Sequence, residues 1–386
     1  MKKAVMYGAG NIGRGFIGKV FSDSGYEVCF LDIDKQVLAA FNKEHAYRVH
    51  IVSDGQSHYE TVKNVYAVDA GDERAAEEIA GCDIMATAVG VNVLPHIAAT
   101  MAKGIALRMS RGGGALDVIL AENQIDADKL MREMIYKKLD GETRSWADKN
   151  LGLVEASIGR MVPPLTPEEK AADPLLIAVE PYAELPVDAL GFKNGIPPLL
   201  GLKPFTPFSF YVKRKLFLHN MGHALCAYFG YQSGYAYISD AIRDARIKKT
   251  VAAAMQCTVL ALGKEYLAVP QEEITANKDD LLYRFKNRAL RDTISRVAGD
   301  PVRKLRKNDR LVGAALYAME WDIDPGSIIK GITAALFYDN KDDPGAVKIQ
   351  QLLAERGIDA VLTDVMGLSP KEPLARLIRE GYGKAI

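Results

Sequence analysis

The stretch from Lys3 to Gly18 reads KAVMYGAGNIGRGFIG, and it decides the fold of the first part of the chain. A short apolar run leads directly into Gly8, Gly10 and Gly13, and a helical pattern follows. In dinucleotide-binding units the first glycine makes the tight turn after the strand, the second lets backbone approach the pyrophosphate, and the third lets helix pack on strand. The stretch therefore predicts such a unit, with the phosphates at the helix N-terminus. Asn11 and Ile12 complete the predicted cofactor-binding turn.

A second strand-like run, Glu27 to Asp32, ends in an acid about 20 residues past the glycines, where such units carry the residue that binds the ribose. A carboxylate there accepts hydrogen bonds from a ribose 2′-OH and repels a 2′-phosphate. We therefore predict NAD rather than NADP as the cofactor. Asp34 is the competing acid, because the strand has room to end two residues later. The alternative interpretation is a glycine turn that binds nothing, followed by a solvated aspartate.

Strand-like and helical runs alternate as far as about residue 125. We expect helices near 35–44 and 72–80, a hairpin-like stretch near 47–69, and strands at 83–89 and 115–120. This alternation predicts a mostly parallel sheet with helices on both faces, and ligands at the carboxyl ends of its strands. That rule brings Thr87 and Gly90 to the cofactor, although both are equally compatible with ordinary strand-end residues. Glu122 and Asn123 lie just beyond the second of these strands.

The clearest change in composition is the proline-rich and glycine-rich stretch 186–207. We place the domain boundary within it, which gives an NAD-binding Rossmann-type domain over 1–195 and a mainly α-helical domain over 196–386. The second domain is predicted to be helical because long amphipathic segments run near 207–229, 240–267 and 279–299.

Composition and charge favour a small-molecule enzyme. Among the 386 residues, 49 basic and 49 acidic side chains balance, so no general affinity for nucleic acid or membrane surfaces is expected. No apolar run reaches the length of a membrane span, and the first strand begins at once, which leaves no room for a signal peptide. We expect a cytoplasmic protein without a metal site. Its four widely spaced cysteines are expected to be reduced, mostly buried thiols: Cys29, Cys82, Cys226 and Cys257.

A second chemical signal, KRKLFLHNMGH, runs from Lys213 to His223. On an α-helix, Lys215, Asn220 and His223 fall within an arc of about 140°, which allows all three to face one cleft. Alcohol oxidation by hydride transfer needs a base with a pKa near the working pH. Burial and the neighbouring charges of Lys213 and Arg214 are expected to lower the pKa of Lys215. The alternative is a solvated basic helix face beside a core histidine.

The glycine turn and the Lys-x4-Asn-x2-His motif together resemble the polyol-specific long-chain dehydrogenases of the mannitol dehydrogenase family. The similarity runs nearly from end to end. It implies a metal-free, NAD-dependent enzyme, a monomer or homodimer, with a Rossmann domain, a helical domain and an active site between them. Other matching segments are Val179-Glu180-Pro181, Gly222-His223-Ala224, Arg284-Phe285-x-Asn287, Arg303-Lys304-Leu305, Asp309-Arg310-Leu311 and Asp342-Asp343-Pro344.

The resemblance also implies roles for individual residues. Lys215 would be the general base, Asn220 and Asn123 would form the oxyanion site, and His223 would orient the substrate or the lysine. Basic residues would hold the substrate and its phosphate. Those expected there are Arg296, Lys304 and Arg160, with Arg214, Arg284 and Arg303 as further candidates.

The chain length suits the sugar-phosphate branch of the family, which implies reversible oxidation of D-mannitol 1-phosphate to D-fructose 6-phosphate. One departure matters, because Gly159 stands where the family carries an aspartate that reaches substrate hydroxyls. Glu155 or Glu122 is the candidate replacement carboxylate. The alternatives are therefore another sugar phosphate, a free polyol, or a hexuronate such as tagaturonate or fructuronate. A sensor that binds NADH without catalysis is the alternative outside the enzymes.

Overall fold

The computed structural model describes residues 1–122 and 124–385, and the chain divides into two compact units. The first unit is Met1–Ser209 and the second is Phe210–Ile386. The predicted boundary at 195/196 falls earlier than this division, because strand β11 (Leu202–Phe205) pairs in parallel with β10 (Leu185–Asp188) and so belongs with the first unit.

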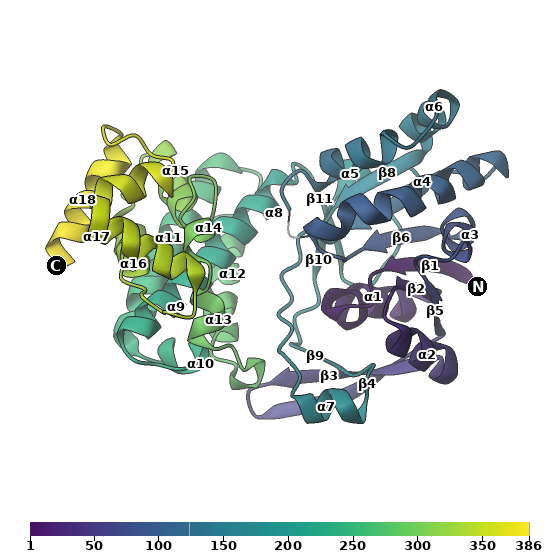
Figure 1. Ribbon diagram of the computed structural model, residues 1–386, viewed down its shortest axis with the longest axis horizontal. Helices are drawn as coiled ribbons and strands as arrows, with labels where there is room; N and C mark the ends of the chain where they lie inside the picture. Colours follow the sequence, from purple (N-terminus) through teal and green to yellow (C-terminus); the bar gives the residue numbers. More distant parts are fainter. Residues whose placement is uncertain (123, 386) are drawn as a thin grey trace. The chain divides into compact units, whose positions relative to one another are not determined.

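A six-stranded parallel sheet forms the centre of the first unit, as Figure 1 shows. Its strand order, β5-β2-β1-β6-β7-β8, is that of dinucleotide-binding folds, in which the order reverses beside the first strand. The predicted sheet is confirmed, and every pairing within it is parallel. The strands are β1 (Lys2–Tyr7), β2 (Tyr26–Asp32), β5 (Val65–Asp69), β6 (Ile84–Thr87), β7 (Leu116–Leu120) and β8 (Leu151–Glu155).

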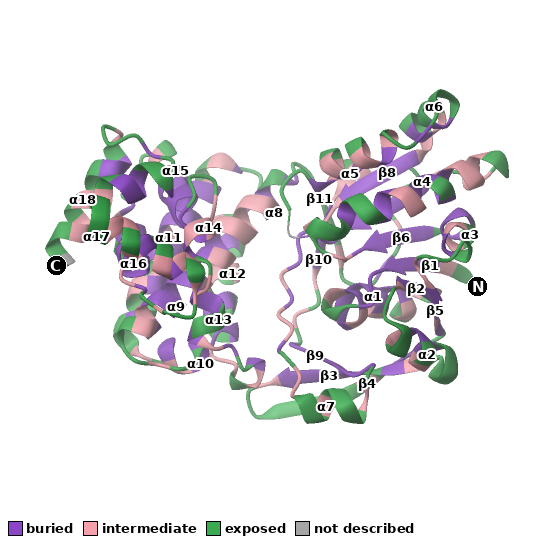
Figure 2. Cartoon of the chain, in the orientation of Figure 1, coloured by how far each residue is buried: buried purple, intermediate pink, exposed green. Residues whose placement is uncertain are grey.

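Alternate residues of these strands face two separate cores, since side chains along a strand point to opposite faces. Met6 and Phe30 belong to one core, and Val5 and Leu31 belong to the other. Figure 2 shows the sheet strands as mostly buried. Helices α1 (Gly18–Asp23) and α2 (Lys35–Glu44) cover the first face, while the second is covered by α3 (Arg74–Gly81), α4 (Leu94–Ser110), α5 (Ala127–Tyr136) and α6 (Gly141–Asn150).

A small three-stranded sheet adjoins the first core. Strands β3 (Ala46–Ser53) and β4 (Gln56–Lys63) form the hairpin predicted within 47–69, and β9 (Ile177–Val179) pairs in parallel with β3. Helix α7 (Pro167–Ala172) precedes β9 and begins at a Thr166 capping box.

The second unit is helical, with α9 (Met221–Gln232) at its centre. This helix packs against α10, α11, α13 and α16. Its residues are apolar on nearly all sides, which is typical of a helix buried within a domain. The other helices are α8 (Ser209–Lys213), α10 (Ile238–Ala241), α11 (Ala245–Glu265), α12 (Gln271–Arg284), α13 (Ile294–Ala298), α14 (Pro301–Lys304), α15 (Val312–Glu320), α16 (Gly326–Leu336), α17 (Pro344–Asp364) and α18 (Pro373–Ala385).

The helix predicted over 279–299 is wrong as one element. Helix α12 ends at Arg284, and a new turn begins where the Asn287 side chain accepts a hydrogen bond from the Ala289 N–H at 3.1 Å. Arg291 then adopts a left-handed conformation with φ of 51°. The helix is therefore interrupted between α12 and α13.

None of the helices in the described part of the chain is long and apolar enough to cross a membrane. The four cysteines are free and buried, as predicted.

Candidate functional site

The glycine turn after β1 has the tight geometry that its sequence predicts. Gly8 has φ of +99°, where a side chain is strained, and a Cβ there would lie 2.7 Å from the Ala88 carbonyl oxygen. A Cβ at Gly13 would overlap the carbonyl oxygen of Gly8. These two glycines are therefore required by the packing of the turn on the helix and on β6.

Gly10 differs, because it is exposed and a Cβ there would meet no atom within 4 Å. The space beside its backbone is open to a ligand, which fits the expected approach of a pyrophosphate. Asn11 is exposed at the start of the helical segment, whereas Ile12 packs against the first core. The turn thus fits a dinucleotide, although Ile12 contributes packing.

The strand-end acid is Asp32. Strand β2 ends there, and the carboxylate accepts hydrogen bonds from the backbone N–H groups of Ala9 at 2.6 Å and Ile33 at 2.7 Å. The competing acid, Asp34, instead caps α2 by accepting from the Gln36 N–H at 2.9 Å. Asp32 is therefore the acid beside the glycine turn, and this Rossmann domain fits NAD.

The end of β6 lies at the same edge of the sheet, because Tyr7 pairs with Leu31 on one side and Thr87 on the other. Gly90 is exposed there, with φ of +87° and open space around it. Thr87 is fully buried and donates its hydroxyl hydrogen bond to Glu122 Oε2 at 2.7 Å. Gly90 thus remains a candidate for cofactor contact, whereas Thr87 supports the loop through Glu122.

Glu122 was predicted only as a spare carboxylate near the substrate. Its Oε1 also accepts a hydrogen bond from the Val89 N–H at 3.2 Å, and burial raises its pKa. It joins the ends of β6 and β7. Asn123, the predicted second oxyanion residue, lies outside the described residues.

In the second unit, the segment that carries the lysine motif is a π-helix over Arg214–Asn220, placed between α8 and α9. The expectation of a regular α-helix is wrong here. In a π-helix the backbone pairs residues five apart, so Lys215 and Asn220 stand one turn apart on one face. On an α-helix they would be about 140° apart. The wider turn therefore makes the side chains of Lys215, the predicted base, and Asn220, the predicted amide, leave the helix on more nearly the same side.

Lys215 is partly buried, and burial together with the positive charge of Arg310 lowers its pKa to about 8. The prediction that the charges of Lys213 and Arg214 lower the pKa of Lys215 is wrong. The Lys213 ammonium group pairs with Glu265 at 2.5 Å. The Arg214 guanidinium lies over the ring of Tyr211, 4.4 Å from its centroid. Arg310 therefore supplies the positive charge that was expected to come from Lys213 and Arg214.

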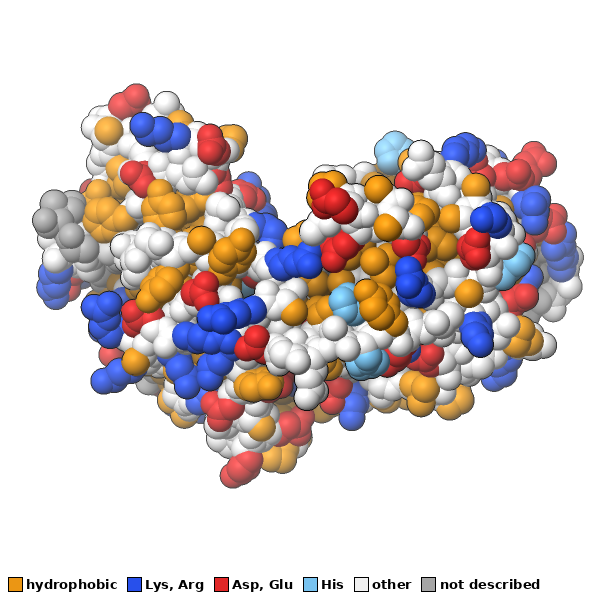
Figure 3. Space-filling model, turned by 90° about the horizontal axis from the view of Figure 1, so that it is seen from below, with side chains coloured by type: hydrophobic (Ala, Val, Ile, Leu, Met, Phe, Trp, Pro, Cys, Tyr) orange, Lys and Arg blue, Asp and Glu red, His pale blue; other side chains and the backbone are white. Residues whose placement is uncertain are grey.

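Lys304 is buried near the same arginine. Its carbonyl accepts a hydrogen bond from the Leu311 N–H at 3.3 Å, which folds the segment after α14 back on itself. Burial, followed by the charges of Arg310 and Arg303, lowers the pKa of Lys304 to about 8. We call Lys215, Lys304 and Arg310 the cationic cluster. Figure 3 also shows lysine and arginine side chains gathered on one face of the helical unit.

His223 forms a second group with residues from the α12–α13 region. Its Nε2 lies 3.2 Å from Asp292 Oδ2, and its ring stacks on Phe285 at 4.9 Å between centroids. The other oxygen of Asp292 pairs with the Arg296 guanidinium. Asp292 is buried and links two predicted site residues, although the sequence reasoning missed it.

Arg160, a predicted phosphate ligand, is buried in the first unit. Its Nε donates to the Glu180 carbonyl at 2.9 Å and its Nη1 donates to the Gly15 carbonyl at 3.1 Å. These contacts give Arg160 a structural role beneath the first helix. Of the other candidates, Arg284 pairs with Asp280 at 3.4 Å and Arg303 pairs with Asp300 at 2.8 Å.

The position of the missing family aspartate, Gly159, faces Tyr182. A Cβ there would lie 3.3 Å from the tyrosine ring, so the ring fills space that a side chain would need. Glu155, the other candidate replacement, accepts a hydrogen bond from the Ala127 N–H at 2.9 Å. Burial and the charge of Asp128 raise the pKa of Glu155 to about 7.

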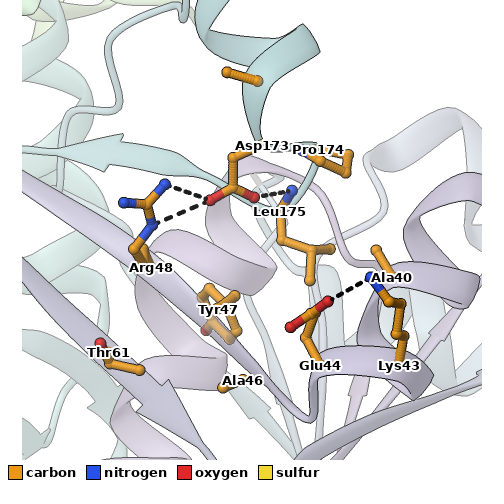
Figure 4. Close-up of a pocket in the computed structure, with 11 residues that line it drawn as sticks. Ala40, Lys43, Glu44, Ala46, Tyr47, Arg48, Thr61, Asp173, Pro174 and Leu175 are labelled. Carbon is orange, nitrogen blue, oxygen red and sulfur yellow. Dashed lines mark hydrogen bonds and ion pairs between the residues drawn. The ribbon is translucent and has the colours of Figure 1, made fainter.

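The first unit also carries an open pocket of about 460 Å³ beside α2 and β3. Figure 4 shows its charged groups paired with one another, Arg48 with Asp173 and Lys43 with Glu44. We assign no ligand to it. The described residues contain no group of three or more histidine, cysteine, aspartate or glutamate side chains able to hold a metal ion.

The parallel sheet and its glycine turn define the first unit as a Rossmann-type dinucleotide-binding domain. The sequence pattern of the mannitol dehydrogenase Rossmann domain matches residues 2–201, and that of the mannitol dehydrogenase C-terminal domain matches residues 208–378. The chain therefore belongs to the mannitol dehydrogenase family, whose members are oxidoreductases that act on CH–OH groups of polyols with NAD.

Two solved structures share the fold. Mannitol 2-dehydrogenase from Pseudomonas fluorescens, in a ternary complex with NAD and D-mannitol, matches with a TM-score of 0.76 at 15% identity, covering 99% of this chain and 91% of that chain. A D-sorbitol dehydrogenase in substrate-free form matches with a TM-score of 0.73 at 18% identity, covering 87% of this chain and 80% of that chain. The predicted two-domain architecture is confirmed.

Proposed function

We propose that this chain interconverts D-mannitol 1-phosphate and D-fructose 6-phosphate with NAD, the reaction of a mannitol-1-phosphate 5-dehydrogenase, using Lys215 as the general base. The observation that carries the proposal is the cationic cluster, in which the partly buried Lys215 and the buried Lys304 lie near Arg310, whose charge helps to lower the pKa of each lysine. A base of this kind suits an alcohol, and the surrounding charge suits a phosphorylated one.

Lys215 takes the proton from the C5 hydroxyl in the direction of oxidation. A pKa of about 8 leaves a useful fraction of neutral amine at neutral pH, whereas an ordinary lysine is almost entirely protonated. A bound NAD would supply the acceptor for the hydride that leaves the same carbon. The residues expected to hold it are those of the glycine turn, Gly8, Gly10 and Gly13, together with Asp32.

The amide of Asn220 donates a hydrogen bond to the oxygen as negative charge develops there, which is the role of an oxyanion site. Its position on the π-helical turn puts the donor on the same face as the base. His223 orients the substrate, because Asp292 and the Phe285 ring hold its imidazole in one direction. Asn123 is proposed as the second amide.

The substrate phosphate is proposed to bind Lys304 and Arg296, assisted by the charge of Arg310. Lys304 is only 5% exposed, so water solvates its charge poorly. The negative charge of a bound phosphate group would offset the repulsion between Lys304 and the neighbouring Arg310 and Arg303. Arg296 offers a planar fork of donors, and its guanidinium is half-exposed beside Asp292.

The test is NADH oxidation with fructose 6-phosphate, run beside fructose, tagaturonate and fructuronate. We expect fast turnover of fructose 6-phosphate and no comparable turnover of the three unphosphorylated ketoses. Faster turnover of an unphosphorylated ketose would show that this ketose, and not fructose 6-phosphate, is the substrate. If no ketose is turned over although NADH binds tightly, the protein is better described as an NADH sensor.

A free polyol is the second candidate. Two observations favour it: Gly159 removes a carboxylate near the proposed substrate site, and two of the solved structures with a similar fold are a mannitol 2-dehydrogenase and a D-sorbitol dehydrogenase. In the same assay, oxidation of mannitol or sorbitol faster than mannitol 1-phosphate would establish it.

A further inference from the structure

The π-helical turn Arg214–Asn220 needs support, because its wider ring is less favourable than an α-helical one and frees carbonyl groups from their usual partners. Such turns occur mostly as single interruptions of α-helices, and this one separates α8 from α9. The neighbouring helix α11 contacts it directly.

Helix α11 holds the turn at two points. The buried hydroxyl of Thr258 donates a hydrogen bond to the Phe217 carbonyl oxygen, within the turn, at 2.9 Å. Seven residues further along, Glu265 binds Lys213, which directly precedes the turn. Seven residues make about two turns of an α-helix, so Thr258 and Glu265 lie on the same side of α11.

The second of these contacts, between Glu265 and Lys213, is held in place by Tyr317. Tyr317 donates its hydroxyl hydrogen bond to Glu265 Oε2 at 2.6 Å, and the Lys213 ammonium group lies 4.8 Å from the centroid of the same tyrosine ring. The charge of Lys213 is therefore used to hold the start of the turn.

The first unit contains an independent example of the same arrangement. Its glycine turn also leads into a π-helical segment, Gly13–Ile17. There the hydroxyl of Tyr47, from β3, donates a hydrogen bond to the Arg14 carbonyl oxygen at 2.7 Å. In each unit, a hydroxyl from a neighbouring element thus binds a carbonyl of the π turn that carries predicted site residues.

We infer that Thr258 is a positioning residue, whose hydroxyl keeps the turn π-helical and thereby keeps Lys215 and Asn220 on one face. The inference rests on the proposed function of Lys215. Without the hydroxyl, the turn relaxes towards an α-helix, and the two side chains rotate apart.

The test compares Thr258→Val, which removes the hydroxyl at nearly constant size, with Thr258→Ser, which keeps it. We expect kcat to fall about 100-fold in the valine variant with KM changed by less than about twofold, because a base displaced by about 1 Å loses that much. The serine variant is expected to retain activity within about threefold of wild type.

Thr250→Val is the matched control. Thr250 lies on the same helix, but its hydroxyl donates to the Arg246 carbonyl of that helix at 3.0 Å. This variant is expected to keep wild-type kinetics. Should Thr258→Val not fold, Thr258→Cys, with a weaker donor, is expected to give an intermediate loss. Wild-type kcat in a folded valine or cysteine variant would overturn the inference.

A second readout does not depend on the substrate. Labelling of Lys215 by acetic anhydride at a series of pH values, followed by mass spectrometry, reports its pKa in the free protein. We expect the pKa to rise towards that of an ordinary lysine in Thr258→Val and to stay near the wild-type value in Thr258→Ser. If the wild type turns over no ketose but this difference is found, the proposed function fails and the positioning role stands. An unchanged pKa together with unchanged kcat refutes the positioning role alone.

Discussion

The Asp32 carboxylate accepts a hydrogen bond from the Ala9 N–H at 2.6 Å, so the acid at the end of β2 holds the glycine turn at the end of β1. One carboxylate oxygen is directed to the turn, and the other accepts from the backbone that follows β2. Asp32 therefore shapes the cofactor turn as well as setting the charge beside it.

Replacement of Asp32 by asparagine is expected to shift cofactor preference. Asp32→Asn keeps an oxygen for the Ala9 N–H but removes the charge, so kcat/KM with NAD should fall about tenfold and use of NADP should rise. The ratio of the two kcat/KM values measures this. The control is Asp34→Asn, because asparagine caps a helix as well as aspartate. An unchanged ratio in Asp32→Asn would refute the assignment.

Alanine at Gly10 should weaken NADH binding, whereas alanine at Gly13 should lower the stability of the fold. Gly10→Ala meets open space, so thermal stability is expected to stay within about 0.5 kcal/mol of wild type while NADH affinity falls at least about tenfold. Gly13→Ala overlaps the Gly8 carbonyl and should lower the free energy of unfolding by about 2 kcal/mol or more. Denaturant unfolding and NADH titration separate the two. Loss of stability in Gly10→Ala would contradict the open geometry.

Removal of the proposed base should slow the hydride-transfer reaction strongly without changing the affinity for NADH. Lys215→Ala is expected to lower kcat by about 10² to 10⁴, the usual contribution of a general base, with NADH binding nearly unchanged. Lys249→Ala, at an exposed position on α11, is the control. Near-wild-type turnover in Lys215→Ala would exclude the lysine.

The pH dependence should follow Lys215. Because its pKa is lowered to about 8, kcat/KM for polyol oxidation should rise with pH through about 8, as the neutral amine forms. Ketose reduction needs the protonated lysine and should decline over the same range. Arg310→Gln removes a positive charge, so it should raise the pKa and move both profiles to higher pH. Arg306→Gln, on an exposed arginine, should leave them in place. Superimposable profiles for Arg310→Gln would contradict the role of its charge.

Lys304 should distinguish phosphorylated from free substrates. Lys304→Met keeps an apolar chain in the buried position but removes the charge, so KM for fructose 6-phosphate should rise at least about tenfold. Turnover of free fructose should be unaffected. Lys307→Met, whose exposed ammonium group pairs with Glu372 at 3.2 Å, is the control. Equal effects on phosphorylated and free ketose would remove Lys304 from the phosphate site.

The first unit was largely predictable, because several local patterns there independently indicate the same fold. The glycine spacing, the acid at the end of β2 and the alternation of strands and helices all indicate the same parallel sheet. The end of β2 was ambiguous by two residues. It was settled by Asp34, which caps α2.

The second unit was less predictable, because its site depends on contacts between distant segments. The sequence predicts α-helical geometry at Lys215, because no residue composition distinguishes a π-helical turn from an α-helical one. Asp292 follows a short turn that interrupts a predicted helix, so its contact with His223 was not predictable from the sequence. Arg310 lowers the pKa of Lys215 from far along the chain, whereas the adjacent Lys213 is neutralised by Glu265.

The burial of all four thiols has a practical consequence. Burial raises the pKa of every one of them, which suppresses the reactive thiolate, so maleimide labels should leave the native cysteines untouched. Two cysteines introduced at one exposed lysine on each unit, by Lys43→Cys and Lys348→Cys, would then be the labelled positions. A donor and acceptor dye at this pair would report, in solution and without a crystal, how the distance between the two units responds to NADH.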